Sequence, residues 1–162
     1  MEKQEEIIRQ FIIELEKGQK EFPKELPPRD GEKYLFKKQM TGYDEKSYYE
    51  IFQMGDCLYF TAVQEISHQH DELTTLQLIN WLNGWSHYGI FSLHSSNNYI
   101  LYEQTHFCRF FEYTIAEIAD FYNQMLRRTS MYTLSADLVF NKKIKIEEAV
   151  DMATKTIGAI HN

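Results

Sequence analysis

Three strand-like runs follow one another between residues 33 and 67, with only short breaks between them. The runs are KYLFKKQM, SYYEIFQM and CLYFTAVQEIS, and their aromatic and β-branched residues favour strands. The breaks, TGYDEK and GD, have the composition of turns. Because strands joined by short turns pair with their immediate neighbours, we predict an antiparallel β-meander. An aromatic content of 15% also favours a large β component.

A second pair of strands is predicted where YGIFSLHS and NYILYEQTHF meet at a turn around SSNN. Side chains alternate between the two faces of a strand. One predicted face consists of Phe91, Leu93, Ile100 and Tyr102, and the other of Ile90, Ser92, His94, Tyr99, Leu101 and Glu103. The first face suits a core. We expect the mixed second face to bind a polypeptide through Ile90, His94, Tyr99 and Leu101, and a purely solvated surface is the alternative.

Helices are predicted before, between and after these strands from the 3.6-residue spacing of apolar side chains. They cover residues 2–17, 71–84, a long segment that opens at Thr114, and 146–160. The motif TIAE is a capping box, in which Thr114 and Glu117 each bind the other's backbone amide. The predicted order is α-βββ-α-ββ-α-α. This order indicates an α+β fold in which helices pack on one face of an antiparallel sheet, a β-meander plus a β-hairpin.

A single domain is predicted over residues 1–162, a length sufficient for one hydrophobic core. Residues 21–32 hold all three prolines and are interpreted as an internal connector, because too little chain precedes them to fold alone. Residues 141–162 are interpreted as a C-terminal helical extension.

The formal charge of −7 disfavours nucleic acid and anionic lipid as partners. No apolar run approaches the roughly 20 residues that span a bilayer. The acidic N-terminus lacks the pattern of a secretory signal, and there are only two cysteines, Cys57 and Cys108. We therefore expect a reduced, cytoplasmic protein whose thiols are packed in the interior.

His68 and His70 suggest a metal site, because side chains two residues apart project to the same side of a strand and both imidazoles could bind one ion. The competing interpretation is a strand-to-helix junction in which Asp71 is the N-cap of the next helix. His106 and Cys108 raise the separate possibility of an activated thiolate, against that of a packed cysteine. Motifs of hydrolases, nucleotide-binding proteins and metalloproteases are absent from the sequence. We expect no enzyme activity, no cofactor and no metal.

The helix predicted over residues 71–84 has apolar residues on two faces. One face is assigned to Leu73, Leu76, Ile79 and Leu82, with Asn83 as a further candidate, and the other to Leu78, Trp81 and Trp85. A helix that is apolar on two sides is buried on two sides. The second face therefore needs a partner, either the C-terminal helix or another subunit. Leu78, Trp81 and Trp85 are the candidates for self-association in a homodimer.

The segment LQLINWLNGWSHYGIFSLHSSNNYILYEQ, residues 76–104, resembles the middle of bacterial YbjN-like proteins. Their Ile-Asn-x-x-Asn element is matched by Ile79, Asn80 and Asn83. The predicted element order is similar to that of the type III secretion chaperone-like fold. The resemblance implies a small, cytoplasmic, non-catalytic protein, commonly dimeric, that binds another polypeptide or takes part in regulation. In such chaperones the client chain wraps around the sheet in an extended form.

Three functions are consistent with these features. The leading hypothesis is a protein-binding adaptor or chaperone-like regulator. The second is a small metal-dependent enzyme or metal-binding protein that uses His68 and His70. The third is an inhibitor or immunity-type protein whose acidic surface blocks a basic partner.

Overall fold

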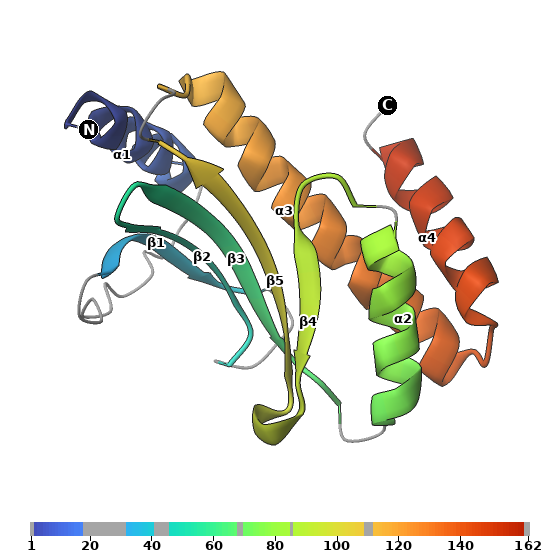
Figure 1. Ribbon diagram of the computed structural model, residues 1–162. Coiled ribbons are helices and arrows are strands. Elements are labelled where there is room, and N and C mark those ends of the chain that lie inside the picture. The colour runs from blue at the N-terminus through green and yellow to red at the C-terminus, as the bar shows by residue number, and fades with distance from the viewer. Residues whose placement is uncertain are drawn as a thin grey trace.

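The computed structural model describes residues 2–17, 32–40, 46–67, 70–84, 86–108 and 112–160 (Figure 1). Its centre is an antiparallel five-stranded sheet with strand order β1-β2-β3-β5-β4. The strands are β1 (Glu32–Gln39), β2 (Tyr48–Met54), β3 (Cys57–Glu65), β4 (Ile90–His94) and β5 (Tyr99–Phe107). The helices are α1 (Glu2–Glu16), α2 (Glu72–Gly84), α3 (Ile115–Ala136) and α4 (Ile146–Ile160). The predicted α+β class and element order are confirmed.

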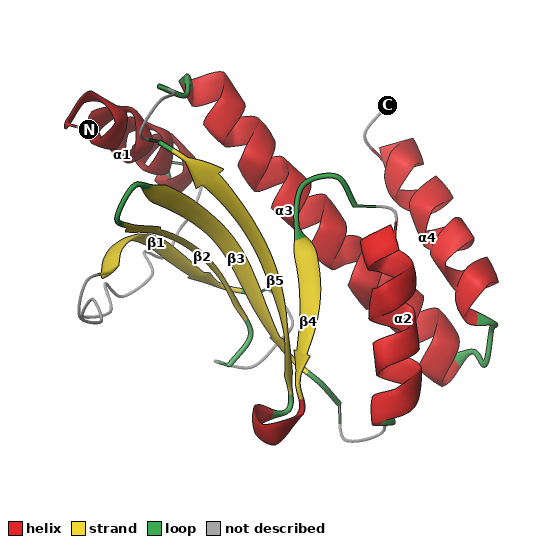
Figure 2. Cartoon of the chain, viewed as in Figure 1, coloured by secondary structure: helices red, strands yellow, loops and turns green. Residues whose placement is uncertain are grey.

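The helices lie on one side of the sheet (Figure 2). α3 crosses the middle strands, α1 contacts β1 and α3, and α2 contacts β4 (Figure 1). α4 forms an outer layer on α2 and α3, where it buries Ala149, Val150 and Ala153. Its small alanine side chains let the helix backbones approach closely. A π-helical turn, Asp137–Asn141, extends α3 before the chain reverses into α4. Among the described helices, none is both long enough and apolar enough to cross a membrane.

Two turns in the sheet depend on left-handed backbone conformations. Gly55 joins β2 to β3 with φ of 57°, and Asn98 precedes β5 with φ of 56° after the short 3-10 helix Ser95–Asn97. Glycine and asparagine adopt this conformation most easily. The predicted turns at GD and SSNN are therefore present. The predicted TGYDEK turn lies mostly outside the described residues, since 41–45 are not among them.

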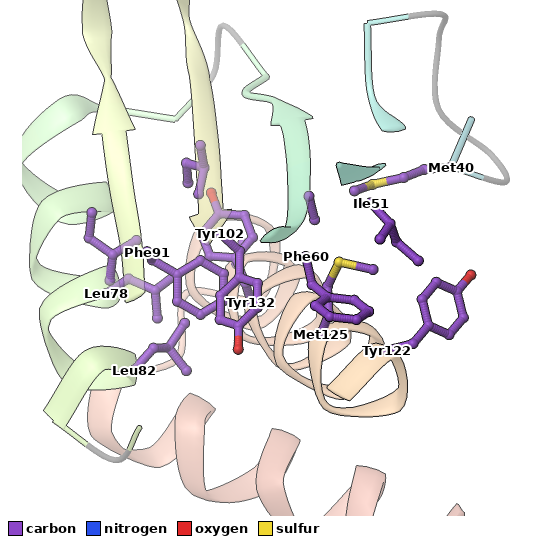
Figure 3. Close-up of a cluster of buried hydrophobic side chains, with 14 of the residues drawn as sticks. Met40, Ile51, Phe60, Leu78, Leu82, Phe91, Tyr102, Tyr122, Met125 and Tyr132 are labelled. Atoms are coloured by element: carbon purple, nitrogen blue, oxygen red, sulfur yellow. The ribbon is translucent and has the colours of Figure 1, made fainter. Parts of the chain in front are cut away.

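The hydrophobic core lies between the inner face of the sheet and the helices (Figure 3). Alternate residues of the strands supply one side of it, and the inward stripes of α2 and α3 supply the other. Its members include Ile51, Phe60, Phe91, Tyr102, Leu78, Leu82, Tyr122, Met125 and Tyr132. The Phe60 ring packs edge-on against Phe121 at 5.9 Å between centroids. The aromatic residues of the sequence thus supply much of the contact between sheet and helices.

The capping box predicted at the start of α3 is present. The Glu117 amide donates to Thr114 Oγ1 at 3.3 Å, and the Thr114 amide donates to Glu117 Oε2 at 2.8 Å. Glu117 Oε2 accepts from both the Thr114 amide and the Thr114 hydroxyl, and these two hydrogen bonds favour the charged carboxylate and lower the pKa of Glu117. Local side-chain chemistry therefore sets where the longest helix begins.

The predicted division of α2 into two apolar faces is wrong. Leu78 is completely buried together with Ile79 and Leu82, whereas Leu73 is 66% exposed. The reason is geometric: residues 75, 78, 79 and 82 form one stripe at helical spacing, and this stripe faces β4, α3 and α4. Leu78 therefore belongs to the core of this chain and is not available for self-association.

Two further predictions meet the limits of the described residues. Of the predicted connector, residues 21–31 lie outside them, and Glu32 begins β1. Trp85 also lies outside the described residues. The predicted C-terminal helix corresponds to α4.

Candidate functional site

The face of the sheet that points away from the helices, here called the outer face, carries large apolar side chains. Its described members are Lys37 and Gln39 from β1, Tyr48, Glu50, Phe52 and Met54 from β2, Cys57, Tyr59, Thr61, Val63 and Glu65 from β3, Ile90, Ser92 and His94 from β4, and Tyr99, Leu101, Glu103, Thr105 and Phe107 from β5. Ile90 and Phe107 are each 62% exposed, and Met54 is 44% exposed. A sheet face with this composition is typical of a recognition surface.

The aromatic rings of the outer face are held in place by cross-strand pairing. Phe52 and Tyr59 are direct partners on β2 and β3. Their rings stack with their centroids 4.7 Å apart and an angle of 2° between the ring planes. His94 and Tyr99 are direct partners in the β4–β5 hairpin and stack at 4.6 Å. Rings fixed in this way lose little conformational freedom when a partner binds. The outer face is therefore a preorganised surface.

Acidic side chains interrupt this apolar surface. Glu50, Thr61 and Glu103 form a row across β2, β3 and β5, and Thr61 Oγ1 donates to Glu50 Oε2 at 3.3 Å. Glu65 pairs with Lys46 at 3.0 Å. Glu103 is half-buried, and within the described residues its carboxylate has neither an ion pair nor a hydrogen bond. The outer face thus offers one unpaired negative charge among apolar side chains.

The predicted separation of the β4–β5 hairpin into two faces is confirmed. Phe91, Ile100 and Tyr102 are buried against the helices, and Leu93 packs half-buried beside them. All four predicted partner-binding residues lie on the outer face: Ile90, His94, Tyr99 and Leu101. Sequence reasoning missed the contributions of β2 and β3, among them Met54 and Tyr59. The alternation of YYEIFQM and CLYFTAVQE, aligned with that of the hairpin, could have identified them.

The edge of the sheet at β4 is closed by the end of α2. Asn83 Nδ2 donates to the Phe91 carbonyl at 2.9 Å, and the Phe91 amide donates to Asn83 Oδ1 at 2.8 Å. This amide pairs with the strand as a neighbouring strand would. Ser86 Oγ makes similar contacts with the backbone of Gly89. The backbone of Phe91 is therefore not available to pair with a further strand at this edge.

The outward side of α2 is a second exposed apolar surface. Leu73 and Leu76 are exposed, and Trp81 is 40% exposed. Of the three predicted self-association residues, only Trp81 lies at the surface in the described part of the chain.

The strand-to-helix junction interpretation is supported at Asp71. The Thr74 amide donates to Asp71 Oδ1 at 2.8 Å, so Asp71 caps α2, and this hydrogen bond lowers the pKa of Asp71. The imidazole of His70 stacks on Phe140 at 3.9 Å, and burial lowers the pKa of His70. His68 lies outside the described residues. Among the described side chains, no three His, Cys, Asp or Glu residues gather as metal ligands do.

His106 and Cys108 do not form a catalytic pair. The His106 ring stacks on Phe121 at 3.6 Å on the inner side of the sheet, and its Nε2 lies 2.8 Å from Gln104 Nε2. Burial lowers the pKa of His106 to about 4. The Cys108 thiol donates to the His106 backbone carbonyl at 3.9 Å, and burial raises the pKa of Cys108. A protonated thiol that does not contact the imidazole is not an activated nucleophile.

Comparison with known proteins supports the fold. No family model and no curated protein sequence matches this chain. A solved structure of YbjN from E. coli, described as a candidate transcription regulator, is similar, with a TM-score of 0.55 and 17% sequence identity. The match covers 82% of this chain and 90% of that chain. The chain therefore has a YbjN-like fold, as the sequence resemblance predicted.

Proposed function

We propose that this protein is a non-catalytic cytoplasmic adaptor or chaperone-like regulator that holds another polypeptide against the outer face of its sheet. The observation that carries this proposal is the exposure of Ile90, Phe107 and Met54 on a surface whose aromatic rings are already ordered. Large apolar side chains gathered on one face favour association, because burying apolar surface contributes a favourable free energy of about 25 cal/mol per Å². A regulatory role also suits the description of YbjN as a candidate transcription regulator.

The chemistry of the outer face indicates the kind of polypeptide that fits. The apolar and aromatic side chains suit an extended segment with apolar residues at alternate positions. Glu103 suits a basic side chain of the partner, and the net charge of −7 attracts basic segments at long range. The preferred partner is therefore an extended segment with alternating apolar residues and at least one lysine or arginine.

Site-specific photocrosslinking in the host tests this assignment. A photoreactive phenylalanine analogue replaces Ile90 in one variant and Met152, an exposed residue of α4, in the control. We expect a discrete polypeptide adduct at position 90 and none at position 152. Mass spectrometry of the adduct then identifies the partner segment. Adducts of equal yield at both positions, or none at either, would contradict binding at the outer face.

Self-association through α2 is the second part of the proposal. Trp81 is partly exposed on the outward side of the helix, the side that also carries Leu73. Trp81→Ala is expected to shift a homodimer toward monomer in light scattering, whereas Met152→Ala, at the same 40% exposure, leaves it unchanged. A wild-type protein that is monomeric at every concentration would remove this part of the proposal.

A further inference from the structure

A cavity of about 470 Å³ lies on the helix side of the sheet, between the ends of β1 and β2 and the C-terminal half of α3. Cavities that bind small molecules usually measure roughly 300–1,000 Å³. Lys38 and Tyr49 are cross-strand partners, so both side chains point to this side. Opposite them, Leu126 and Ser130 lie four residues apart on one face of α3. The cavity is therefore built by two regular elements.

Two opposite charges line this cavity without neutralising each other. Lys38 is half-buried, Asp137 is the C-cap residue of α3, and both belong to the lining. Within the described residues neither forms an ion pair, with the other or with a third group. One carboxylate oxygen of Asp137 accepts from Asn141 Nδ2 at 2.8 Å, which leaves the second oxygen available. A partly buried charge without a counterion gains from an oppositely charged ligand group.

The remaining lining is apolar or aromatic. Met40 is 4% exposed, and Leu126 packs half-buried against the core. Tyr49 adds an aromatic ring, and Ser130 adds an exposed hydroxyl. The cavity thus combines a positive group, a negative group and an apolar wall.

We propose that this cavity binds a free α-amino acid with a large apolar side chain. Its carboxylate pairs with Lys38, its ammonium group pairs with Asp137, and its side chain lies against Met40 and Leu126. A zwitterion is the simplest small ligand that satisfies both charges at once. A simple carboxylate leaves Asp137 unpaired, and a simple amine leaves Lys38 unpaired.

This site is separate from the proposed polypeptide site. Lys37, one residue before Lys38, points to the other side of the sheet, where its Nζ lies 3.4 Å from the centre of the Tyr48 ring. The cavity and the outer face are thus on opposite sides of the same strands. Either proposal can fail without affecting the other.

Isothermal titration calorimetry on the full chain tests the proposal with L-leucine, L-methionine and L-phenylalanine as probes. We expect the wild type to bind at least one of them with a Kd below about 1 mM. Lys38→Gln and Asp137→Asn each remove one charge and are expected to weaken binding roughly tenfold. Lys145→Gln, which alters an exposed lysine outside the cavity, is expected to leave the Kd unchanged.

Two analogues separate the roles of the charges. 3-Phenylpropionate lacks the amine, so its weaker binding should depend on Lys38 and not on Asp137. 2-Phenylethylamine lacks the carboxylate and should show the opposite dependence. An analogue that binds as tightly as L-phenylalanine would overturn the zwitterion assignment.

A cavity-filling variant guards against effects on folding. Ser130 lines the cavity and is exposed, so Ser130→Phe should abolish ligand binding without lowering Tm. Asn123 is exposed on the same helix outside the cavity, so Asn123→Phe should retain ligand binding. No heat with any probe up to about 10 mM would overturn the proposal. So would binding that Lys38→Gln, Asp137→Asn and Ser130→Phe all leave unchanged.

Discussion

The two faces of the sheet meet different environments. On the inner face, Ile51, Leu58 and Phe60 are completely buried, whereas Ile90 and Phe107 on the outer face are more than half exposed. Their hydrophobicity is similar, so hydrophobicity does not decide which face is buried. The connections decide it, because they place the helices on one side (Figure 2). The comparison indicates that the exposed side chains of the outer face, Ile90 and Phe107, contribute less to folding than the buried side chains of the inner face.

The largest expected effect is on the inner face, at Phe60. Its ring packs against Phe121 and His106, at 5.9 and 5.8 Å between centroids. Phe60→Ala leaves a cavity in the core and should lower the free energy of unfolding by about 3–5 kcal/mol. Phe107→Ala removes the same atoms from the outer face and should cost less than about 0.5 kcal/mol. Urea denaturation of both variants measures the difference, and equal losses would refute the contrast between the faces.

The next effect is expected at Asn83, which hydrogen-bonds the backbone of the edge strand β4. Asn83→Ala removes both hydrogen bonds to the Phe91 backbone and should cost about 1–3 kcal/mol in urea denaturation. It also frees the β4 edge, so light scattering should detect concentration-dependent association.

Asn80→Ala is the matched control, because Asn80 is exposed on the same helix. We expect it to change neither stability nor association. If both variants behave alike, Asn83 does not protect the edge.

Local signals account for what could be predicted from the sequence. The turns at Gly55 and Asn98 and the capping box at Thr114 depend on residues a few positions apart, and all are present. The β4–β5 faces followed from alternation around one turn. Because the hairpin pairs with β3, the same alternation could have extended the outer face to Tyr59, but strand order is not a local property.

Tertiary neighbours account for what could not be predicted. Leu78 and Leu73 are equally apolar residues of α2, and only the position of β4, α3 and α4 makes one buried and the other exposed. Asn83 contacts Phe91 because a helix end reaches a strand edge. The cavity joins Lys38 to Asp137 across 99 positions of the chain, and no spacing rule connects them.

A smaller effect is expected from pH at His106. Burial lowers its pKa to about 4 in the folded protein, whereas an unfolded histidine has a pKa of about 6.5. The unfolded chain therefore takes up this proton first as pH falls. The stabilisation is complete above about pH 6.5 and is lost progressively toward pH 4. After solvent screening of the partly exposed ring, we expect His106 to account for a loss of about 1 kcal/mol between pH 7 and pH 5.

Urea denaturation at both pH values measures this loss. His106→Gln keeps an acceptor for Gln104 but cannot be protonated. Its free energy of unfolding should therefore fall by about 1 kcal/mol less between pH 7 and pH 5 than that of the wild type. His94→Gln, on the outer face, is the control. A pH dependence that His94→Gln reduces and His106→Gln does not would reverse the assignment.

The smallest effect on stability is expected at Ile90, and it sharpens the comparison most. Ile90→Ser replaces an exposed apolar side chain, so the free energy of unfolding should change by less than about 0.5 kcal/mol. The same change should reduce the fluorescence of a bound apolar dye such as anilinonaphthalene sulfonate, because the dye loses part of its surface. Met152→Ser removes a similarly exposed apolar side chain from α4 and should leave the dye signal unchanged. If Ile90→Ser instead destabilises the protein as strongly as Phe60→Ala, the outer face belongs to the core and cannot serve as the binding surface.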